Sequence, residues 1–162
     1  MEAHAQGHAG ALGDLVQRGE AVGVGALDPH LVPQLSLHHV EDLGKALDRI
    51  ARLLVENGTL ILVGFAHERL SGATARWYQE QLRALAAVGR GAPVHLDRAL
   101  DDVHTFSAMR RELASRFVER FFEWTPYLYR YELDEAIEPL ERWLIELEAI
   151  QPTGFRYVGS PR

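Results

Sequence analysis

Two adjacent histidines, His38 and His39, are the residues of this sequence best placed to carry out chemistry. They follow a short apolar segment, Leu31–Leu37, and precede a helical pattern. An imidazole titrates near neutral pH, so either ring can accept a proton from a hydroxyl or an amine, or can orient a bound ligand. The alternative is that both rings bond backbone groups where the helix begins. A metal site is not expected, because two neighbouring histidines lack a third ligand at a suitable spacing.

The composition of the chain excludes several classes of protein. The 162 residues are enough for one compact domain, and 47% of them are hydrophobic and 25% charged, as in a folded globular protein. A formal net charge of -6 without a basic block argues against a general nucleic-acid-binding protein. With no cysteine, disulfides and thiolate sites are excluded. The longest apolar run, around Leu60–Phe65, is far shorter than a membrane span, and no signal-peptide pattern precedes it, so we expect a cytoplasmic protein with no membrane partner.

A strand, a helix and a second strand are expected to position the two histidines. The segment Leu31–Leu37 predicts a short strand, in which Pro33 favours an edge or a bulge. Thr59–Phe65 is a nearly continuous apolar run, typical of a central parallel strand covered on both faces. The three elements together predict one right-handed crossover of an α/β sheet. Between the strands, apolar spacings of three and four residues predict an amphipathic helix with Val40, Leu43, Leu47, Ile50 and Leu54 on its buried side.

Three more helices are predicted further along the chain. Residues 70–88 form the first of them. Thr105 or Ser107 is expected to cap the second, because a hydroxyl at this position accepts a hydrogen bond from a free backbone N–H. Asp134–Ile150 predicts the third, in which Pro139 is tolerated only within the first turn. The apolar face of this last helix consists of Leu140, Leu144 and Leu147.

The segment Phe117–Leu133 is rich in aromatic residues and is interrupted by Pro126, so we expect strand structure on both sides of the proline. Gly154–Gly159 predicts a short closing strand. Buried aromatic side chains are common in protein cores, and this is the simplest interpretation of the aromatic segment. The alternative interpretation is a wall of a substrate site. The aromatic residues concerned are Phe121, Phe122, Trp124, Tyr127, Tyr129 and Tyr131.

The segment Gln34–Phe65 resembles the middle of the class I S-adenosylmethionine-dependent methyltransferases. In that family the fourth strand ends in a turn with one or two histidines, a helix follows, and a glycine-containing turn leads into the fifth strand. Here Ala46–Leu54 has a sequence that is familiar from the helix of this family, Ala-Leu-Asp-Arg-Ile-Ala-Arg-Leu-Leu. The sequence Glu-Asn-Gly at 56–58 stands where the family usually has Pro-Gly-Gly. Gly154–Gly159 is similar to the last strand of one subgroup.

The resemblance implies an α/β fold with a Rossmann-like doubly wound sheet of the class I methyltransferase type, partial because its N-terminal βα units are incomplete. Residues 31–162 then form a methyltransferase-like domain. Residues 1–30 form an irregular or degenerate segment, too short for the family's front half. Gly10 resembles part of the family's glycine-rich turn, and Asp28 resembles the acidic residue that ends the family's second strand. An open sheet edge in such a domain favours pairing with another chain, so a homo-oligomer is expected.

The activity that the resemblance implies is methyl transfer from S-adenosylmethionine to a small-molecule acceptor. Ligands of open α/β sheets lie beyond the carboxyl ends of the strands, which places His38 and His39 as candidate catalytic residues. The cofactor-binding candidates are Gln34, Leu35, Ser36, His38, Gly10 and Asp28. The acceptor-side candidates are Trp77, His104, Tyr127 and Tyr129. The alternative hypothesis is an inactive methyltransferase remnant or partner subunit that acts through association. A nicotinamide-dependent enzyme is disfavoured, because no G-x-G-x-x-G motif follows a predicted strand.

Overall fold

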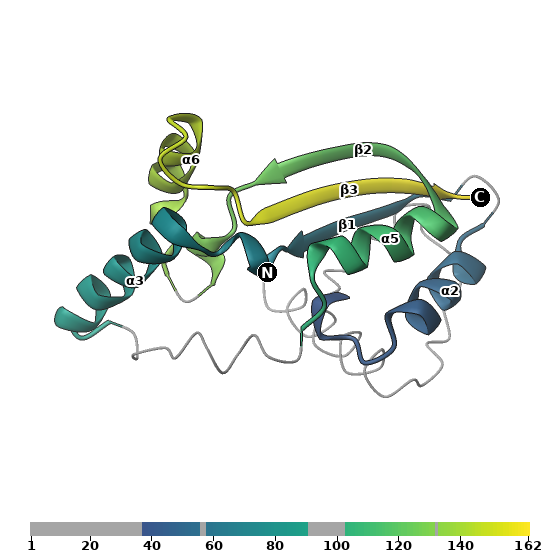
Figure 1. Cartoon of the computed structure of the whole chain (residues 1–162), viewed down its shortest axis with the longest axis horizontal. Coiled ribbons are helices and arrows are strands. Elements are labelled where there is room, and N and C mark those ends of the chain that lie inside the picture. The colour runs from purple at the N-terminus through teal and green to yellow at the C-terminus, as the bar shows by residue number, and fades with distance from the viewer. Residues whose placement is uncertain (1–36, 56–57, 91–102, 132) are drawn as a thin grey trace, which may run out of the picture.

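The structure is a computed structural model that describes residues 37–55, 58–90, 103–131 and 133–162. These residues form a mixed α/β fold with four α-helices and a small antiparallel sheet of three strands (Figure 1). The helices are α2 (Leu43–Leu53), α3 (Gly72–Ala87), α5 (Phe106–Arg116) and α6 (Glu138–Glu146). The strands are β1 (Leu60–Phe65), β2 (Phe117–Thr125) and β3 (Gly154–Pro161). The short 3-10 helices are η1 (Leu37–His39), η2 (His67–Arg69), η3 (Leu128–Arg130) and η4 (Glu135–Ile137).

The closing strand β3 occupies the middle of the sheet and runs antiparallel to both β1 and β2. Phe65, the last residue of β1, pairs with Gly154, the first residue of β3. On the other side of β3, the register shifts between Glu119 and Phe121, which marks a bulge in β2. The carboxyl end of β1 therefore lies beside the start of β3, and this end of the sheet carries the candidate site described below.

The apolar run at 59–65 does form a strand, but its neighbours differ from the prediction. In the described sheet β1 lies at an edge and pairs antiparallel with β3, and is not a central parallel strand. Leu37 belongs to the 3-10 helix η1, and the rest of the predicted strand at 31–36 lies outside the described residues. An apolar run reports that a strand is buried and carries no information on the direction of the strand beside it. The mixed α/β class is confirmed, whereas the described strands do not form the doubly wound parallel arrangement.

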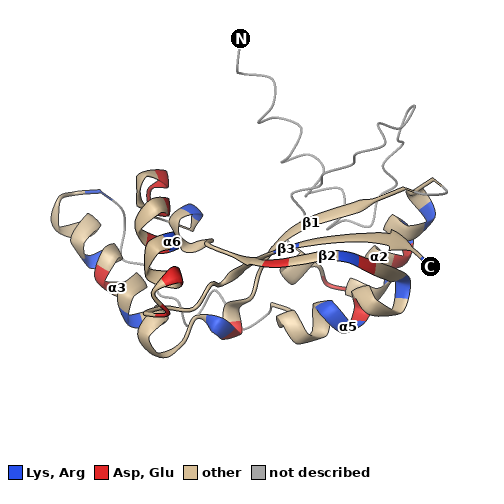
Figure 2. Cartoon of the chain, turned by 90° about the horizontal axis from the view of Figure 1, so that it is seen from above, with Lys and Arg blue, Asp and Glu red and all other residues tan. Residues whose placement is uncertain are grey.

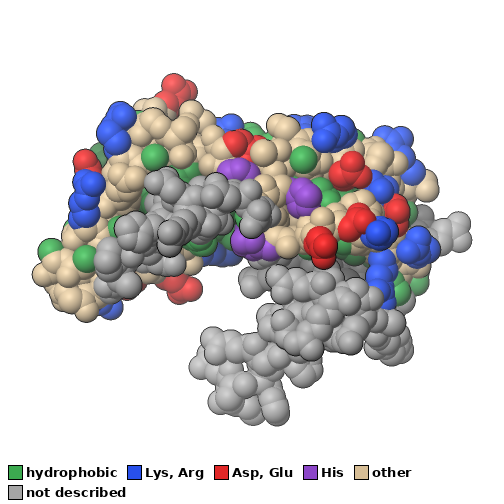
Figure 3. Space-filling view, turned by 60° about the horizontal axis from the view of Figure 1, so that its bottom comes forward, with side chains coloured by type: hydrophobic (Ala, Val, Ile, Leu, Met, Phe, Trp, Pro, Cys, Tyr) green, Lys and Arg blue, Asp and Glu red, His purple; other side chains and the backbone are tan. Residues whose placement is uncertain are grey.

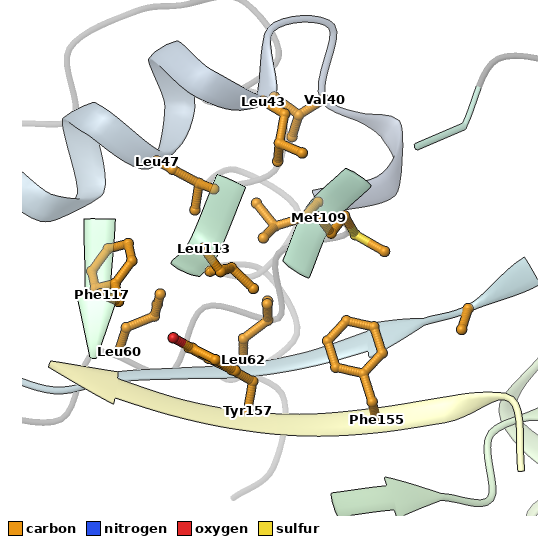
Figure 4. Packing of buried hydrophobic residues seen from close by; sticks show 12 residues of the cluster. Val40, Leu43, Leu47, Leu60, Leu62, Met109, Leu113, Phe117, Phe155 and Tyr157 are labelled. Carbon is orange, nitrogen blue, oxygen red and sulfur yellow. The ribbon is translucent and has the colours of Figure 1, made fainter. Parts of the chain in front are cut away.

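Helices α2 and α5 lie together on one face of the sheet and form the main core with it (Figure 1). Leu47 of α2 and Leu113 of α5 point toward Leu62 of β1 (Figure 4). Each such leucine, fully buried, stabilises the fold by about 1.5–3 kcal/mol relative to an exposed position. The core contains Leu37, Val40, Leu43, Leu47, Leu60, Leu62, Ala66, Met109, Leu113, Phe117, Phe155 and Tyr157.

Gly64 lets the ring of Phe155 lie directly against strand β1. A Cβ atom at position 64 would lie 2.3 Å from Cζ of Phe155, closer than two carbon atoms can approach. The Phe155 ring is fully buried and has no free space to move into. A glycine at this position is therefore required by packing between the two strands.

The amphipathic helix predicted from Val40 to Leu54 is confirmed as α2. Its N-cap is Asp42, whose side chain accepts a hydrogen bond from the backbone N–H of Lys45 at 2.9 Å. Leu43 and Leu47 are buried against the sheet, whereas Lys45 is exposed. The three- and four-residue spacing thus identified the buried side of this helix correctly.

Thr105 caps helix α5, which settles the choice between the two hydroxyl candidates. The Thr105 hydroxyl accepts the backbone N–H of Ala108 at 3.2 Å, while Ser107 lies exposed inside the first turn. We expect Thr105→Ala to lower the free energy of unfolding by about 1 kcal/mol, the usual loss for an N-cap. The matched variant Ser107→Ala should change it by less than about 0.5 kcal/mol, as is usual for an exposed position. Urea denaturation measures both values, and an equal effect of the two variants would contradict the assignment.

Two predictions for the C-terminal third need correction. After Pro126 the chain forms the 3-10 helix η3 and not a second strand, because a buried carboxylate, described below, holds its backbone N–H groups. The helix predicted over 134–150 is shorter: η4 leads into α6, which ends at Glu146, and Pro139 lies in the first turn as expected. The predicted helix at 70–88 and the closing strand at 154–159 are confirmed as α3 and β3.

Candidate functional site at the carboxyl end of strand β1

Four histidines gather around the carboxyl end of β1, in the middle of one face of the molecule (Figure 3). We call them the histidine cluster: His38, His39, His67 and His104. His38 and His39 form the end of η1, and their rings lie 4.3 Å apart between centroids. His67 begins η2, two residues after β1 ends. Two 3-10 helices and the strand between them therefore bring together imidazoles that are far apart in the sequence.

His38 is the chemically distinctive member of the cluster. The residue is only 6% exposed, and its Nδ1 atom is buried without a hydrogen-bond partner among the described residues. Burial, with further contributions from His39 and His67, lowers the pKa of His38 from 6.5 to about 4. The ring is thus uncharged at neutral pH, and a buried nitrogen without a partner costs about 1–3 kcal/mol. Such an unsatisfied group is expected where a ligand supplies the missing partner.

His104 is attached to the same site through its backbone and its ring. Its backbone N–H donates to the carbonyl of His38 at 2.8 Å. Its Nε2 lies 2.7 Å from the carbonyl oxygen of Val40. Since a carbonyl can only accept, Nε2 must carry the proton and donate it. His104 therefore fixes the position of η1 relative to the start of α5.

His67 adds a second buried nitrogen without a hydrogen-bond partner in the described structure. This atom is Nδ1, and the nearest carboxylate oxygen, on Glu68, is 3.7 Å away, too far for a hydrogen bond. His67 and His38 thus both present unsatisfied ring nitrogens beside the end of β1. Polar atoms of this kind are rare in folded proteins, so two of them in one place point to a binding site.

A stack of aromatic rings forms the apolar side of the site. The ring of Phe65 lies 5.9 Å from that of His38 and stacks on Tyr127 at 5.0 Å and on Tyr131 at 5.7 Å between centroids. The hydroxyl of Tyr78 donates to the backbone carbonyl of Tyr131 at 2.8 Å, which fixes the end of the stack. Burial raises the pKa of Tyr127, so its phenol stays protonated at neutral pH. The stack therefore offers uncharged aromatic surface next to uncharged imidazole.

The stack is held in place by a buried carboxylate from helix α6. Glu141 is fully buried and accepts three backbone N–H groups: those of Tyr127 at 2.9 Å, Leu128 at 3.0 Å and Tyr129 at 2.9 Å. These are the free N–H groups at the start of η3, where a negative charge is favoured. Glu141 thus connects α6 to the aromatic wall of the site.

The predicted site residues divide into three groups. His38, His39, His104 and Tyr127 are brought together at the end of β1. Trp77 packs, half-buried, against the small core of Phe65, Tyr78 and Leu128, and the contacts of Tyr129 are with Arg130 and Glu138, so these two are not part of the cluster. Gln34, Leu35, Ser36, Gly10 and Asp28 lie outside the described residues.

The sequence interpretation missed three residues that the structure places in or near the site: Phe65, His67 and Glu141. The first two could have been found, because residues at the carboxyl end of a predicted strand are where ligands of α/β sheets bind. Glu141 gave no such signal. A glutamate on an amphipathic helix normally faces water, and only the tertiary structure shows that it is buried.

A hollow of about 670 Å³ lies beside the cluster, between the start of α2 and helix α5. His104 is the only member of the cluster that lines it, and its other lining residues are mainly charged. One of the charged pairs is already satisfied, because Lys45 lies 2.9 Å from the carboxylate of Asp42. No residue that lines the hollow has a buried side-chain atom without a hydrogen-bond partner in the described structure, so the histidine cluster is the better candidate for ligand binding.

Comparisons with protein-family models, with curated proteins and with solved structures gave no match to this chain. Among the described residues, no group of three or more histidine, aspartate or glutamate side chains has the arrangement of a metal site. None of the described helices is long and apolar enough to cross a membrane. The interpretation of the site therefore rests on its own geometry and on the sequence resemblance.

Proposed function

We propose that the chain takes part in methyl transfer from S-adenosylmethionine to a small-molecule acceptor at the carboxyl end of β1. The observation that supports this most is His38: a buried, uncharged imidazole with an unsatisfied nitrogen, inside the segment that resembles the methyltransferases. The second segment with the resemblance, at 154–159, forms β3 and pairs with β1 along its length. The two segments that resemble the family are thus neighbours in the sheet.

The described residues fit a cofactor that carries a positive sulfonium. Protonated imidazoles would repel such a group, and the lowered pKa keeps His38 uncharged. Aromatic faces attract cations, and Phe65 and Tyr127 present such faces beside His38. By the resemblance, Gln34, Leu35, Ser36 and His38 would hold the cofactor, with Gly10 and Asp28 toward its other end. When bound, S-adenosylmethionine supplies a methyl group already activated by a positive leaving group.

The geometry favours positioning over proton removal as the role of His38. A catalytic base works best with a pKa near the working pH, and a pKa of about 4 makes His38 a weak base at neutral pH. Its unsatisfied Nδ1 can still hydrogen-bond a polar group of the cofactor and so hold it in line with the acceptor. Methyl transfer depends strongly on such alignment in a site that excludes water. His39, the second candidate catalytic residue, is exposed to solvent.

Isothermal titration calorimetry with S-adenosylhomocysteine, the demethylated product, tests the proposal. We expect measurable heat for the full chain at pH 7.5, and at least a tenfold loss of affinity in His38→Phe. Arg52→Gln, an exposed change on α2, serves as the control and should bind like the wild type. Circular dichroism verifies that the variants are folded. Absence of heat at millimolar ligand with a folded wild-type chain would refute the proposed activity for this chain.

A further inference from the structure

Exposed apolar side chains concentrate at one end of the molecule, away from the main core. The described residues include seven large hydrophobic side chains that are exposed, and four of them lie on α6 or at the ends of α3 and α6. Their exposed fractions are 70% for Val88, 42% for Leu140, 56% for Trp143 and 57% for Leu147. Both views show α3 and α6 beside each other at this end (Figures 1 and 2). Exposed apolar groups scattered singly need no explanation, but a cluster marks an interaction site.

Three of these residues form a stripe along one side of α6. Leu140, Trp143 and Leu147 follow each other at spacings of three and four residues, so they share one face of the helix. The sequence predicted that Leu140 and Leu147 belong to a packed face, and the structure shows them exposed. The opposite side of the helix is fixed to the protein by the buried carboxylate of Glu141. The stripe is therefore presented on a firmly anchored helix.

The two neighbouring elements carry opposite charge. Residues 134–148, which contain α6, hold five carboxylates besides the buried Glu141, and one arginine. Residues 72–90, which contain α3, hold three arginines and one glutamate. The arginines are Arg76, Arg83 and Arg90, all exposed; the other exposed residues of α3 are Gln79, Glu80 and five small residues, four of them alanine. Within one chain Arg90 lies 3.5 Å from the carboxylate of Asp134, so the acidic and basic elements belong to one continuous surface.

We propose that this surface binds a second copy of the chain, with the acidic, apolar α6 of each copy packed against the basic α3 of the other. A dimer with twofold symmetry uses the same patch on both subunits, and a patch with one acidic and one basic half is complementary to itself. Pairing α6 with α6 would instead place carboxylates against carboxylates. The exposed alanines at the C-terminal end of α3, Ala84, Ala86 and Ala87, give Trp143 and its neighbours small side chains to pack against. This interface is a face of two helices and is distinct from the sheet edge expected from the sequence.

Sedimentation velocity of the full chain between 5 and 200 µM in low salt tests the proposal. We expect a concentration-dependent dimer that weakens as salt is raised, because exposed charges are screened. Trp143→Glu should weaken dimerisation at least tenfold. Phe121→Glu is the matched control, since Phe121 is 47% exposed on β2, at a different surface, and its substitution should leave the dimer unchanged. A monomer at all concentrations, or a dimer indifferent to Trp143→Glu, would overturn the proposal.

Charge reversal distinguishes this dimer from other modes of self-association. Glu146→Arg and Arg83→Glu are each expected to weaken the dimer several-fold, because each creates like-charge contacts on both sides of the twofold axis. An equimolar mixture of the two variants should restore dimerisation, since every α6 then faces an α3 of opposite charge. Failure of the mixture to recover dimer, with both variants folded, would exclude the pairing of α3 with α6.

Discussion

Replacing Glu141 with alanine is expected to lower the free energy of unfolding by about 3–5 kcal/mol, the loss typical of removing one partner from a buried charged contact. The carboxylate accepts the backbone N–H groups of Tyr127, Leu128 and Tyr129 in a fully buried position. Each N–H that loses its acceptor costs about 1–3 kcal/mol unless water can enter. Urea denaturation monitored by tryptophan fluorescence measures the change.

Two further variants separate this role from general effects on α6. Glu146→Ala removes an exposed glutamate from the same helix and should change the free energy of unfolding by no more than about 0.5 kcal/mol. Glu141→Gln keeps one oxygen but replaces the other with an amide group that donates, so its loss should be intermediate. If Glu141→Ala proves no more destabilising than Glu146→Ala, the anchoring role of the carboxylate is wrong.

The same carboxylate connects the two surfaces for which we propose functions. Glu141 holds the backbone of Tyr127, and the ring of Tyr127 stacks on Phe65 beside His38. On the other side of the helix lies the exposed stripe with Trp143. A dimer that restrains α6 would therefore also restrain the aromatic wall of the ligand site. Loss of Glu141 should disturb both surfaces directly, whereas Trp143→Glu should act on the ligand site only through loss of the dimer.

Local sequence patterns were sufficient for most individual elements. Apolar spacing located α2 and its buried Leu43 and Leu47, because the period of a helix fixes which residues share a face. The sequence offered Thr105 and Ser107 as caps of α5, and the structure shows that Thr105 is the cap. The apolar run before Phe65 identified β1. These features depend on residues a few positions apart, which a single sequence displays directly.

Features that depend on distant residues could not be predicted in the same way. The pairing of β1 with β3 joins segments about ninety residues apart, and nothing in an apolar run specifies an antiparallel neighbour. The approach of His104 to His38 likewise depends on how α5 packs on α2. For the candidate site, the sequence analysis named both His38 and Tyr127, and the structure places both rings against Phe65; it could not reveal that burial lowers the pKa of His38. Burial is a property of the tertiary structure alone.

Because His38 is buried, the folded chain should lose stability in acid. The unfolded chain takes up a proton on this residue near pH 6.5, whereas the folded chain resists it until about pH 4. Above pH 6.5 both states are neutral and the contribution is constant. As the pH falls from 6.5 to 4, the unfolded state binds more protons, and the free energy of unfolding should drop by about 3 kcal/mol from this residue.

His38→Phe removes the titrating group. Between pH 7 and pH 4 the free energy of unfolding of this variant should therefore fall by about 3 kcal/mol less than that of the wild type. Urea denaturation at fixed pH measures both values. His39→Gln removes a smaller contribution to the lowered pKa of His38 and keeps its burial, so this variant should retain most of the wild-type slope near pH 5. Nuclear magnetic resonance of the wild-type chain provides a test that needs no variant, because one imidazole should remain neutral at pH 5. If every imidazole is protonated by that pH while the chain stays folded, His38 is not the buried, uncharged group on which the proposed site depends.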